Sequence, residues 1–278
     1  MMPKTLFAFA TLPLLGAVAQ NSTETFQENV GGYEFIKTGP KKLAPKADYE
    51  WAAAQTALKL LKDGLKAQGK DAILKVLSPA IAEADTFWKD IVATSTGKLE
   101  QKEGWVSADG EGIAFLPNVT AERFVKWYLS PLADVANNAA NPEHYYKATT
   151  TSGTAAVSEI IEGWGGITTH FQVPNFALPP NRERYPFLHE HADFPLQAAG
   201  DKVLMDGTVF GVLHISARNV KGADYGQPID GVHVAASVWY GDAAKDDHLE
   251  DERTHMTTEI INLTLQAQKD IEGGKLPV

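Results

Sequence analysis

The chain has 278 residues, a formal net charge of −10 and no cysteine, which excludes disulfide scaffolds and cysteine-based zinc sites. Its acidic balance argues against a nucleic-acid partner, because phosphates need a surface rich in lysine and arginine. With 44% hydrophobic residues, the chain can form one sizeable core, or a core domain with a small helical lobe.

The first twenty residues have the order of an export signal. Lys4 precedes a short apolar run, and small residues follow it up to Ala19. The run is too short to span a bilayer as a helix, and no membrane anchor is expected elsewhere. We therefore predict a signal peptide over residues 1–19 and a secreted protein, extracellular or in the secretory pathway. Three N-x-S/T sequons agree with a secreted glycoprotein, at Asn21, Asn118 and Asn262.

Residues 20–100 are predicted to form an extended N-terminal segment and a helical lobe. Residues 20–45 are polar and marked by glycine and proline, as in an extended lead-in. Apolar residues then recur at helical spacing over residues 47–67 and again over 71–92. Pro79 is expected to bend or divide the second helix.

Strand character begins within residues 101–278, which we predict to form the main domain. Two short strands, 105–107 and 113–116, are expected on either side of a turn at Asp109-Gly110. Thr120 is a good N-cap for the helix that follows it. Further strands are predicted at residues 154–161, 166–173, 203–205, 209–217 and 232–240, and a loop is expected at 137–142.

A long helix is predicted over residues 246–271, after the last strand. Because the strands cluster between helices instead of alternating with them, a Rossmann or TIM fold is disfavoured. We expect an α+β fold in which a curved antiparallel sheet packs around this long C-terminal helix. Such a grip encloses a cavity, a natural ligand site. Residues 174–195, rich in proline, are a candidate lid for its mouth.

Two residue pairs carry candidate chemistry. His255 and Glu259, four apart on the last helix, share one face and could reach one metal ion, or they form a solvent-exposed pair. His144 precedes a strand, and alternation places Glu159 on the same strand face as Val157. A carboxylate on an apolar face is costly unless it is paired or bound to a cation; the alternative is that the neighbouring Ser158 points inward instead.

Several segments resemble the 2,4-diacetylphloroglucinol hydrolase family, to which phloretin hydrolase is related. The matching segments, in order along residues 104–270, are Phe115-Leu116-Pro117-Asn118-Val119-Thr120-Ala121-Glu122, Pro142-Glu143-His144-Tyr145, Val157-Ser158-Glu159-Ile160-Ile161, the strand 231–241 and His255-Met256-Thr257-Thr258-Glu259-Ile260-Ile261-Asn262-Leu263. The resemblance implies a START/Bet v 1-like helix-grip with an extra N-terminal helical part. It also implies one Zn²⁺ ion held by His144, Glu159, His255 and Glu259, and hydrolysis of a carbon–carbon bond between an acyl group and a phenolic ring.

The acid–base groups are less defined. Tyr145, His170 and His214 are the candidates we select, with Tyr146 and His233 also open. Lys147 stands where the family has an asparagine, and residues 134–140 lack the family's basic and aromatic character, so the substrate can differ. His189-Glu190-His191 could bind a metal weakly but is expected to be a solvated loop.

The sequence therefore predicts a secreted zinc-dependent hydrolase that cleaves a carbon–carbon bond in an acylated phenol or β-diketone-like molecule. Its partner would be a small aromatic or polyketide-like substrate. Two alternatives keep the cavity without this reaction. One is a metal-free cyclase-type enzyme of secondary metabolism, and the other is a non-enzymatic secreted carrier of an apolar small molecule.

Overall fold

The computed structural model describes residues 25–30, 33–38, 46–141, 143–152, 155–164 and 167–276. The predicted signal peptide, residues 1–19, and the sequon at Asn21 lie outside these residues. Contacts divide the chain into two units, Met1–Ala57 and Leu58–Val278. No helix among the described residues combines the length and apolar character that a membrane span needs.

The first unit contains a small hairpin. Strands β1 (Thr25–Val30) and β2 (Tyr33–Thr38) pair antiparallel, in the segment expected to be an extended lead-in. Helix α1 (Lys46–Lys66) begins in this unit and ends in the second one. The remaining elements all belong to the second unit.

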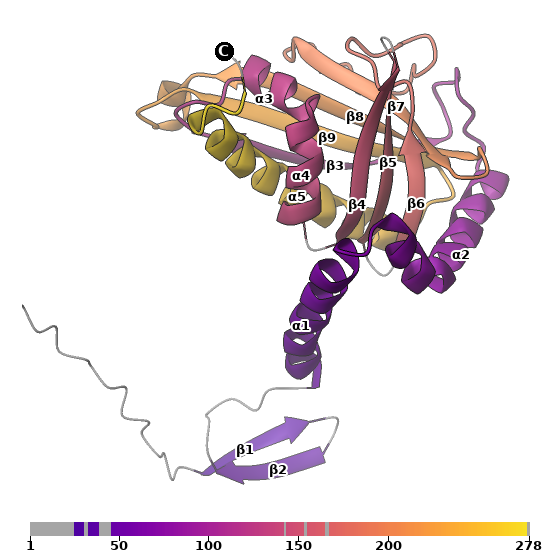
Figure 1. Ribbon diagram of the computed structural model, residues 1–278, viewed down its shortest axis with the longest axis vertical. Helices are drawn as coiled ribbons and strands as arrows, with labels where there is room; N and C mark the ends of the chain where they lie inside the picture. Colours follow the sequence, from indigo (N-terminus) through magenta and orange to yellow (C-terminus); the bar gives the residue numbers. More distant parts are fainter. Residues whose placement is uncertain are drawn as a thin grey trace, which may run out of the picture. The chain divides into compact units, whose positions relative to one another are not determined.

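The second unit is built on one seven-stranded antiparallel sheet (Figure 1). Its strands lie in the order β3-β9-β8-β7-β6-β5-β4, so the first and last strands of the unit are hydrogen-bonded neighbours. Their bounds are β3 Trp105–Ala114, β4 His144–Ser152, β5 Ala155–Trp164, β6 Ile167–Val173, β7 Leu196–Leu204, β8 Val209–Val220 and β9 Gly231–Gly241, with a 3₁₀ turn at Gly222–Tyr225.

One face of the sheet is covered by helices, and we call it the inner face. Helices α3 (Ala121–Tyr128), α4 (Pro131–Ala140) and α5 (Asp246–Glu272) contact it, and α2 (Lys70–Thr94) adds the buried Trp88 to the same core. Trp88 Nε1 donates a 2.9 Å hydrogen bond to Thr169 on β6. This second predicted helix therefore packs with the sheet.

The fold class predicted from the sequence is confirmed. The protein is α+β, with an antiparallel sheet gripping a long C-terminal helix and with helices before the sheet, which is a START/Bet v 1-like helix-grip. Helix α5 ends one residue beyond the predicted boundary. The N-cap at Thr120 is also confirmed, since its side chain accepts from the backbone N–H of Arg123 at 3.3 Å.

The predicted turn at Asp109-Gly110 is wrong, because β3 runs through it without a break and pairs with β9 along its whole length. Gly110 serves a different purpose. A Cβ at this position would lie 2.7 Å from the backbone nitrogen of Thr257 and 2.8 Å from Cβ of Met256. The glycine therefore lets α5 lie directly against the edge strand.

The loop predicted at residues 137–142 is mostly helix. Helix α3 stops at Tyr128, and α4 starts separately after its N-cap, Ser130. The Pro131 ring occupies the first position of α4, where no backbone donor is needed.

Strand β4 was not predicted, because its threonine-rich sequence has no clear apolar alternation.

The outer face of the sheet is covered by the loop between β6 and β7. Tyr185, Phe187 and Leu188 from this loop pack against Val212 and Trp239 in a core of their own. The expectation that residues 174–195 form a lid over the inner cavity is therefore wrong for most of the loop. Only its first part, through Phe176 and Leu178, reaches the pockets of the inner face.

Candidate metal centre

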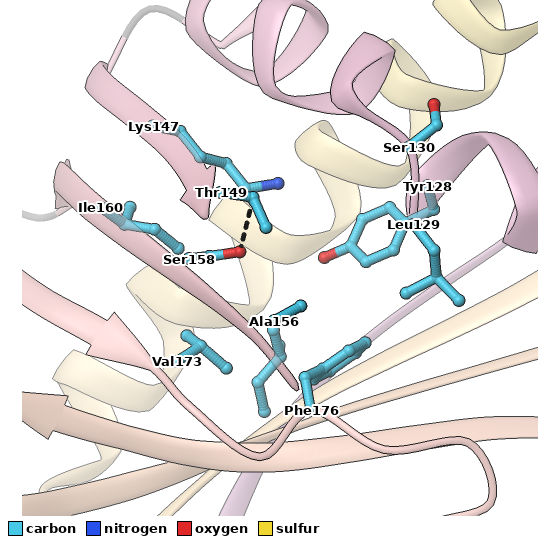
Figure 2. Close-up of a pocket in the computed structure, with 11 residues that line it drawn as sticks. Tyr128, Leu129, Ser130, Lys147, Thr149, Ala156, Ser158, Ile160, Val173 and Phe176 are labelled. Carbon is cyan, nitrogen blue, oxygen red and sulfur yellow. Dashed lines mark hydrogen bonds between the residues drawn. The ribbon is translucent and has the colours of Figure 1, made fainter. Parts of the chain in front are cut away.

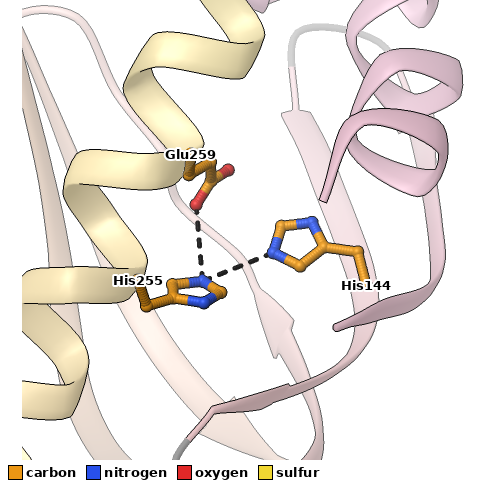
Figure 3. Close-up of side chains that lie close together, drawn as sticks. All are labelled: His144, His255 and Glu259. Atoms are coloured by element: carbon orange, nitrogen blue, oxygen red, sulfur yellow. Dashed lines mark hydrogen bonds and ion pairs between the residues drawn. The ribbon is translucent and has the colours of Figure 1, made fainter. Parts of the chain in front are cut away.

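Three of the four predicted metal ligands meet inside the grip (Figure 3). His144 begins β4, while His255 and Glu259 lie one turn apart on α5. The two Nε2 atoms are 3.4 Å apart, and His255 Nε2 lies 3.6 Å from Glu259 Oε2. One ligand atom from each residue falls within 4.8 Å of the others. These side chains can therefore hold one metal ion.

The group is buried. His144, His255 and Glu259 are 1%, 7% and 9% exposed. Burial lowers the pKa of His144 well below its usual value, and the charge of His255 beside it acts in the same direction. The neutral imidazole that results is the form that binds metal ions.

The predicted fourth ligand, Glu159, lies elsewhere. Its carboxylate accepts a 3.0 Å hydrogen bond from Lys70 Nζ and contacts His170 Nε2 at 2.8 Å. Residues three apart on a strand point to opposite faces of the sheet. Because Ile160 and Glu162 of β5 face inward, Glu159 faces outward, and the placement of Glu159 among the ligands is corrected.

Glu162 is the carboxylate of β5 that lies beside this group. It is the direct antiparallel partner of His144 in the sheet, and its Oε2 atom is 3.2 Å from His144 Nε2. Glu162 is 8% exposed. Sequence reasoning missed it because isoleucines occur at both 160 and 161, so the apolar pattern did not determine which face of β5 is buried.

The charges of the centre favour a cation. Burial raises the pKa of Glu162, which marks the cost of holding its negative charge there. Although burial opposes protonation of His255, a hydrogen bond with Glu143 and the negative charges of Glu162 and Glu259 raise its pKa to about 9. The carboxylates thus draw a proton onto an imidazole, and a divalent cation can supply the same positive charge.

Two small cavities lie on the inner side of the sheet. The first, of about 70 Å³ (Figure 2), is lined mainly by apolar side chains such as Leu129, Val173 and Phe176. The second, of about 30 Å³, includes Glu162 and Glu259 in its wall. Because both are lined by Tyr128, Lys147, Ile160 and Leu213, we describe them as two parts of one cavity. The small volume limits the ligand to a compact molecule unless the cavity widens.

Two polar side chains from the shared wall were not predicted as site residues. The Tyr128 ring points into the cavity (Figure 2), and Lys147 Nζ lies 5.3 Å from the centre of that ring. Lys147 is also paired with Asp134, at 3.3 Å. Burial raises the pKa of Tyr128, so its hydroxyl keeps its proton near neutral pH.

The predicted catalytic residues Tyr145, His170 and His214 line neither part of this cavity. His170 is paired with Glu159 on the outer face. His214 also faces outward, under the loop, where its Nε2 lies 3.3 Å from Ser216 Oγ. Tyr145 sits at an irregularity of β4, between His144 and Tyr146, with its ring beside Gly163. Strand alternation places His170 and His214 on the outer face, and Tyr145 lies outside the cavity wall, which corrects this prediction.

Comparisons with known proteins bear on the fold alone. No protein-family model and no curated protein matches the chain. Among similar solved structures, Ara h 8.0201 has a TM-score of 0.35 and 11% identity, over 61% of this chain and 99% of that one. Ginseng major latex-like protein 151 from Panax ginseng has a TM-score of 0.33 and 12% identity, over 62% and 99%. These scores are too low to argue for a shared activity.

Proposed function

We propose that the protein is a secreted zinc-dependent hydrolase that cleaves a carbon–carbon bond in a compact acylated phenol or β-diketone. The observation that carries this proposal is the buried convergence of His144, His255 and Glu259, of which Glu259 also lines the cavity. The resemblance of several sequence segments to the 2,4-diacetylphloroglucinol hydrolase family supports the same reaction. Export through a signal peptide over residues 1–19 is part of the proposal.

The donor set fits zinc. Two imidazole nitrogens and the carboxylate oxygens of Glu259 and Glu162 are ligands that Zn²⁺ binds, and expansion to five-coordination leaves a position for water or a ketone oxygen. When bound, the ion would act as a Lewis acid toward a ketone oxygen and lower the pKa of a bound water. Glu162 would take the role that the sequence gave to Glu159.

The reaction consumes one water molecule: its hydroxyl ends on the acyl carbon, and the proton that it loses restores the group that protonates the ring carbon. The oxygen of water adds to the ketone carbon, the bond from that carbon to the ring carbon breaks, and its electron pair goes to the ring carbon. A proton then joins the ring carbon, so the products are a carboxylic acid and a phenol with a ring hydrogen. A proton donor must therefore lie beside the ring.

Tyr128 is suited to donate that proton. Its hydroxyl faces the cavity and keeps its proton, because burial raises its pKa. The Lys147 ammonium group beside the ring can stabilise negative charge that forms on the tyrosine oxygen. The apolar wall that includes Val173 and Phe176 would hold the aromatic ring and exclude bulk water.

The first test is metal content. Untagged protein purified without chelator is analysed for bound elements beside the His255→Ala/Glu259→Ala double variant. Zinc lost in a variant that remains folded supports the metal centre, and cleavage of small aryl ketones to a carboxylic acid then tests the reaction. Protein that stays free of metal when zinc is supplied contradicts the hydrolase and leaves a metal-free cyclase or a carrier.

The fate of the N-terminus tests the secretion. Expression of the full chain in a secreting host, followed by N-terminal sequencing of the protein in the medium, should give a chain that starts with Gln20. Retention of the intact chain inside the cell contradicts this part of the proposal.

A further inference from the structure

Imidazoles and carboxylates gather a second time on the outer face of the sheet, separated from the metal centre by the sheet itself. Asp109 and Glu111 project from β3, and His189 and His191 come from the loop that covers this face. Together with Ser237 and Ala235 they line a pocket of about 300 Å³.

Strand register explains why this pocket is hollow. Ala235 on β9 pairs with Glu111 on one side and with Ser216 on the other. The next outward position on β9 is Ser237, which pairs with Asp109. A methyl group therefore forms part of the floor, while nitrogen- and oxygen-bearing side chains surround it. Such a concave, polar site can hold a small cation.

Two of these side chains already lie at the spacing of ligands to one ion. His189 Nε2 is 3.0 Å from Asp109 Oδ1. Two ligand atoms each bound at about 2 Å to a tetrahedral ion lie at about this separation. Ser107 Oγ donates a 2.8 Å hydrogen bond to the other carboxylate oxygen, Asp109 Oδ2. That bond orients the carboxylate, as outer partners of metal ligands do.

His191 brings a second imidazole to the same place. Its ring centre lies 5.3 Å from that of His189, and its Nδ1 atom is 3.0 Å from Ser216 Oγ. Its φ angle of 40° is in the left-handed region, which a residue other than glycine rarely adopts. A backbone held in such a conformation is a pointer to function.

Buried nitrogen atoms beside the two imidazoles lack protein partners. His214 Nδ1 and Trp239 Nε1 are buried and make no hydrogen bond. The His214 ring lies 5.5 Å from His191, and the Trp239 ring lies 4.7 Å from His189. Buried polar atoms are rarely left unpaired in folded proteins. Neither residue lines the pocket itself, so these two nitrogens lie beneath the histidines that do.

The protonation states of His191 and Asp109 also suit a bound cation. Burial and the neighbouring His189 lower the pKa of His191, which keeps its ring neutral. The pKa of Asp109 is lowered as well, since hydrogen bonds from Ser237 and Ser107 outweigh the effect of burial. A neutral imidazole and an ionised carboxylate are the forms that bind metal ions.

We propose that Asp109, His189 and His191 form a second Zn²⁺ site, which fastens the loop of residues 174–195 to strand β3. The Asp109 and His189 side chains are 46% and 39% exposed, which leaves them room to turn toward the pocket. A metal link between distant parts of a chain stabilises the fold much as a disulfide does, and this chain contains no cysteine. The proposal does not depend on the metal centre of the inner face.

Zinc binding to the full protein tests the proposal. Chelator-stripped wild type, the His189→Ala/His191→Ala variant and the His255→Ala/Glu259→Ala variant are titrated with Zn²⁺ by calorimetry. His170→Ala is the matched control, because His170 is paired with a carboxylate on the same face but has no second imidazole beside it. Melting curves in chelator confirm that each variant folds.

The expected result is one equivalent of zinc fewer in the His189→Ala/His191→Ala variant than in wild type, with no loss in His170→Ala. Zinc should also slow trypsin cleavage after Arg182 and Arg184 in wild type but not in this variant. Equal zinc binding by wild type and the His189→Ala/His191→Ala variant overturns the second site. If wild type binds a single equivalent that only this variant loses, the second site stands and the inner metal centre fails.

Discussion

Glu162 and His144 face each other across the β4–β5 pair, with Glu162 Oε2 3.2 Å from His144 Nε2. This contact adds a carboxylate from the sheet to the two ligands supplied by α5. The centre therefore joins β4, β5 and α5, and a metal ion there would connect the C-terminal helix α5 to the edge strand β4.

Replacing Glu162 should weaken zinc binding far more than replacing Glu159. Glu162→Gln removes a ligand charge, and an effect of about 100-fold or more is expected, since even outer partners of metal ligands contribute about 10- to 100-fold. Glu159→Gln is the matched control on the same strand, because its carboxylate binds Lys70 and His170 instead. Competition with a chromogenic chelator measures both. Equal affinities in the two variants contradict the assignment of Glu162.

Tyr128→Phe should reduce kcat without removing the metal. Loss of a general acid typically costs about 10²- to 10⁴-fold in rate, while the ring that packs in the cavity wall is retained. Turnover of an aryl ketone substrate and zinc content are measured on the same preparation. Tyr146→Phe is the control, because Tyr146 lies near Lys70 and outside the cavity wall. A kcat that is unchanged in Tyr128→Phe excludes Tyr128 as the proton donor.

Gly110→Ala should destabilise the protein by about 1–3 kcal/mol, the usual cost of overpacking. The added Cβ would lie 2.7 Å from the Thr257 nitrogen, so α5 would have to move away from β3. Gly64→Ala is the control, since nothing lies within 4 Å of a Cβ there; alanine in a helix is favoured over glycine. Urea unfolding compares the two. A Gly110→Ala protein as stable as wild type contradicts the close approach of α5.

Stability should fall as the pH is lowered from about 6.5 toward about 3, in part because of His214. Burial, followed by the charge of His191, lowers the pKa of His214 to about 3, against about 6.5 in the unfolded chain. The unfolded state therefore binds more protons in this range, and acid favours unfolding. By linkage, His214 alone removes about 2 kcal/mol between pH 7 and pH 5.

The His214→Gln variant isolates this contribution. Its free energy of unfolding, measured with chelator present at pH 7 and pH 5, should decrease by less than that of wild type. An equal decrease in the two proteins shows that His214 is not held neutral by the fold.

Local periodicity predicted most of the long elements of the fold. Helices α2 and α5 follow from apolar residues at helical spacing, and the clustering of strands between helices indicated an antiparallel sheet around α5. Asp109-Gly110 was misassigned because glycine is common both in turns and where two backbones approach closely. Only the position of α5 distinguishes these two cases.

The sequence predicted part of the metal centre and missed Glu162, because helical spacing defines a face and the strand pattern here does not. The spacing of His255 and Glu259 on a helix defines their shared face, whereas a strand with isoleucine on both faces leaves its orientation open. The choice between Glu159 and Glu162 depends on the register of β5 with β4, which is a tertiary property. In the same way, the registers of β6 and β8 place His170 and His214 on the outer face.

X-ray absorption at the zinc edge tests the central claim most directly. The His189→Ala/His191→Ala protein, loaded with one equivalent of zinc, reports on the inner centre without the second proposed site. We predict a spectrum of two imidazole nitrogens and two carboxylate oxygens at about 2.0–2.2 Å, with the imidazole signal reduced in His144→Ala. A zinc ion surrounded only by water oxygens, or a spectrum that His144→Ala leaves unchanged, would contradict the metal centre.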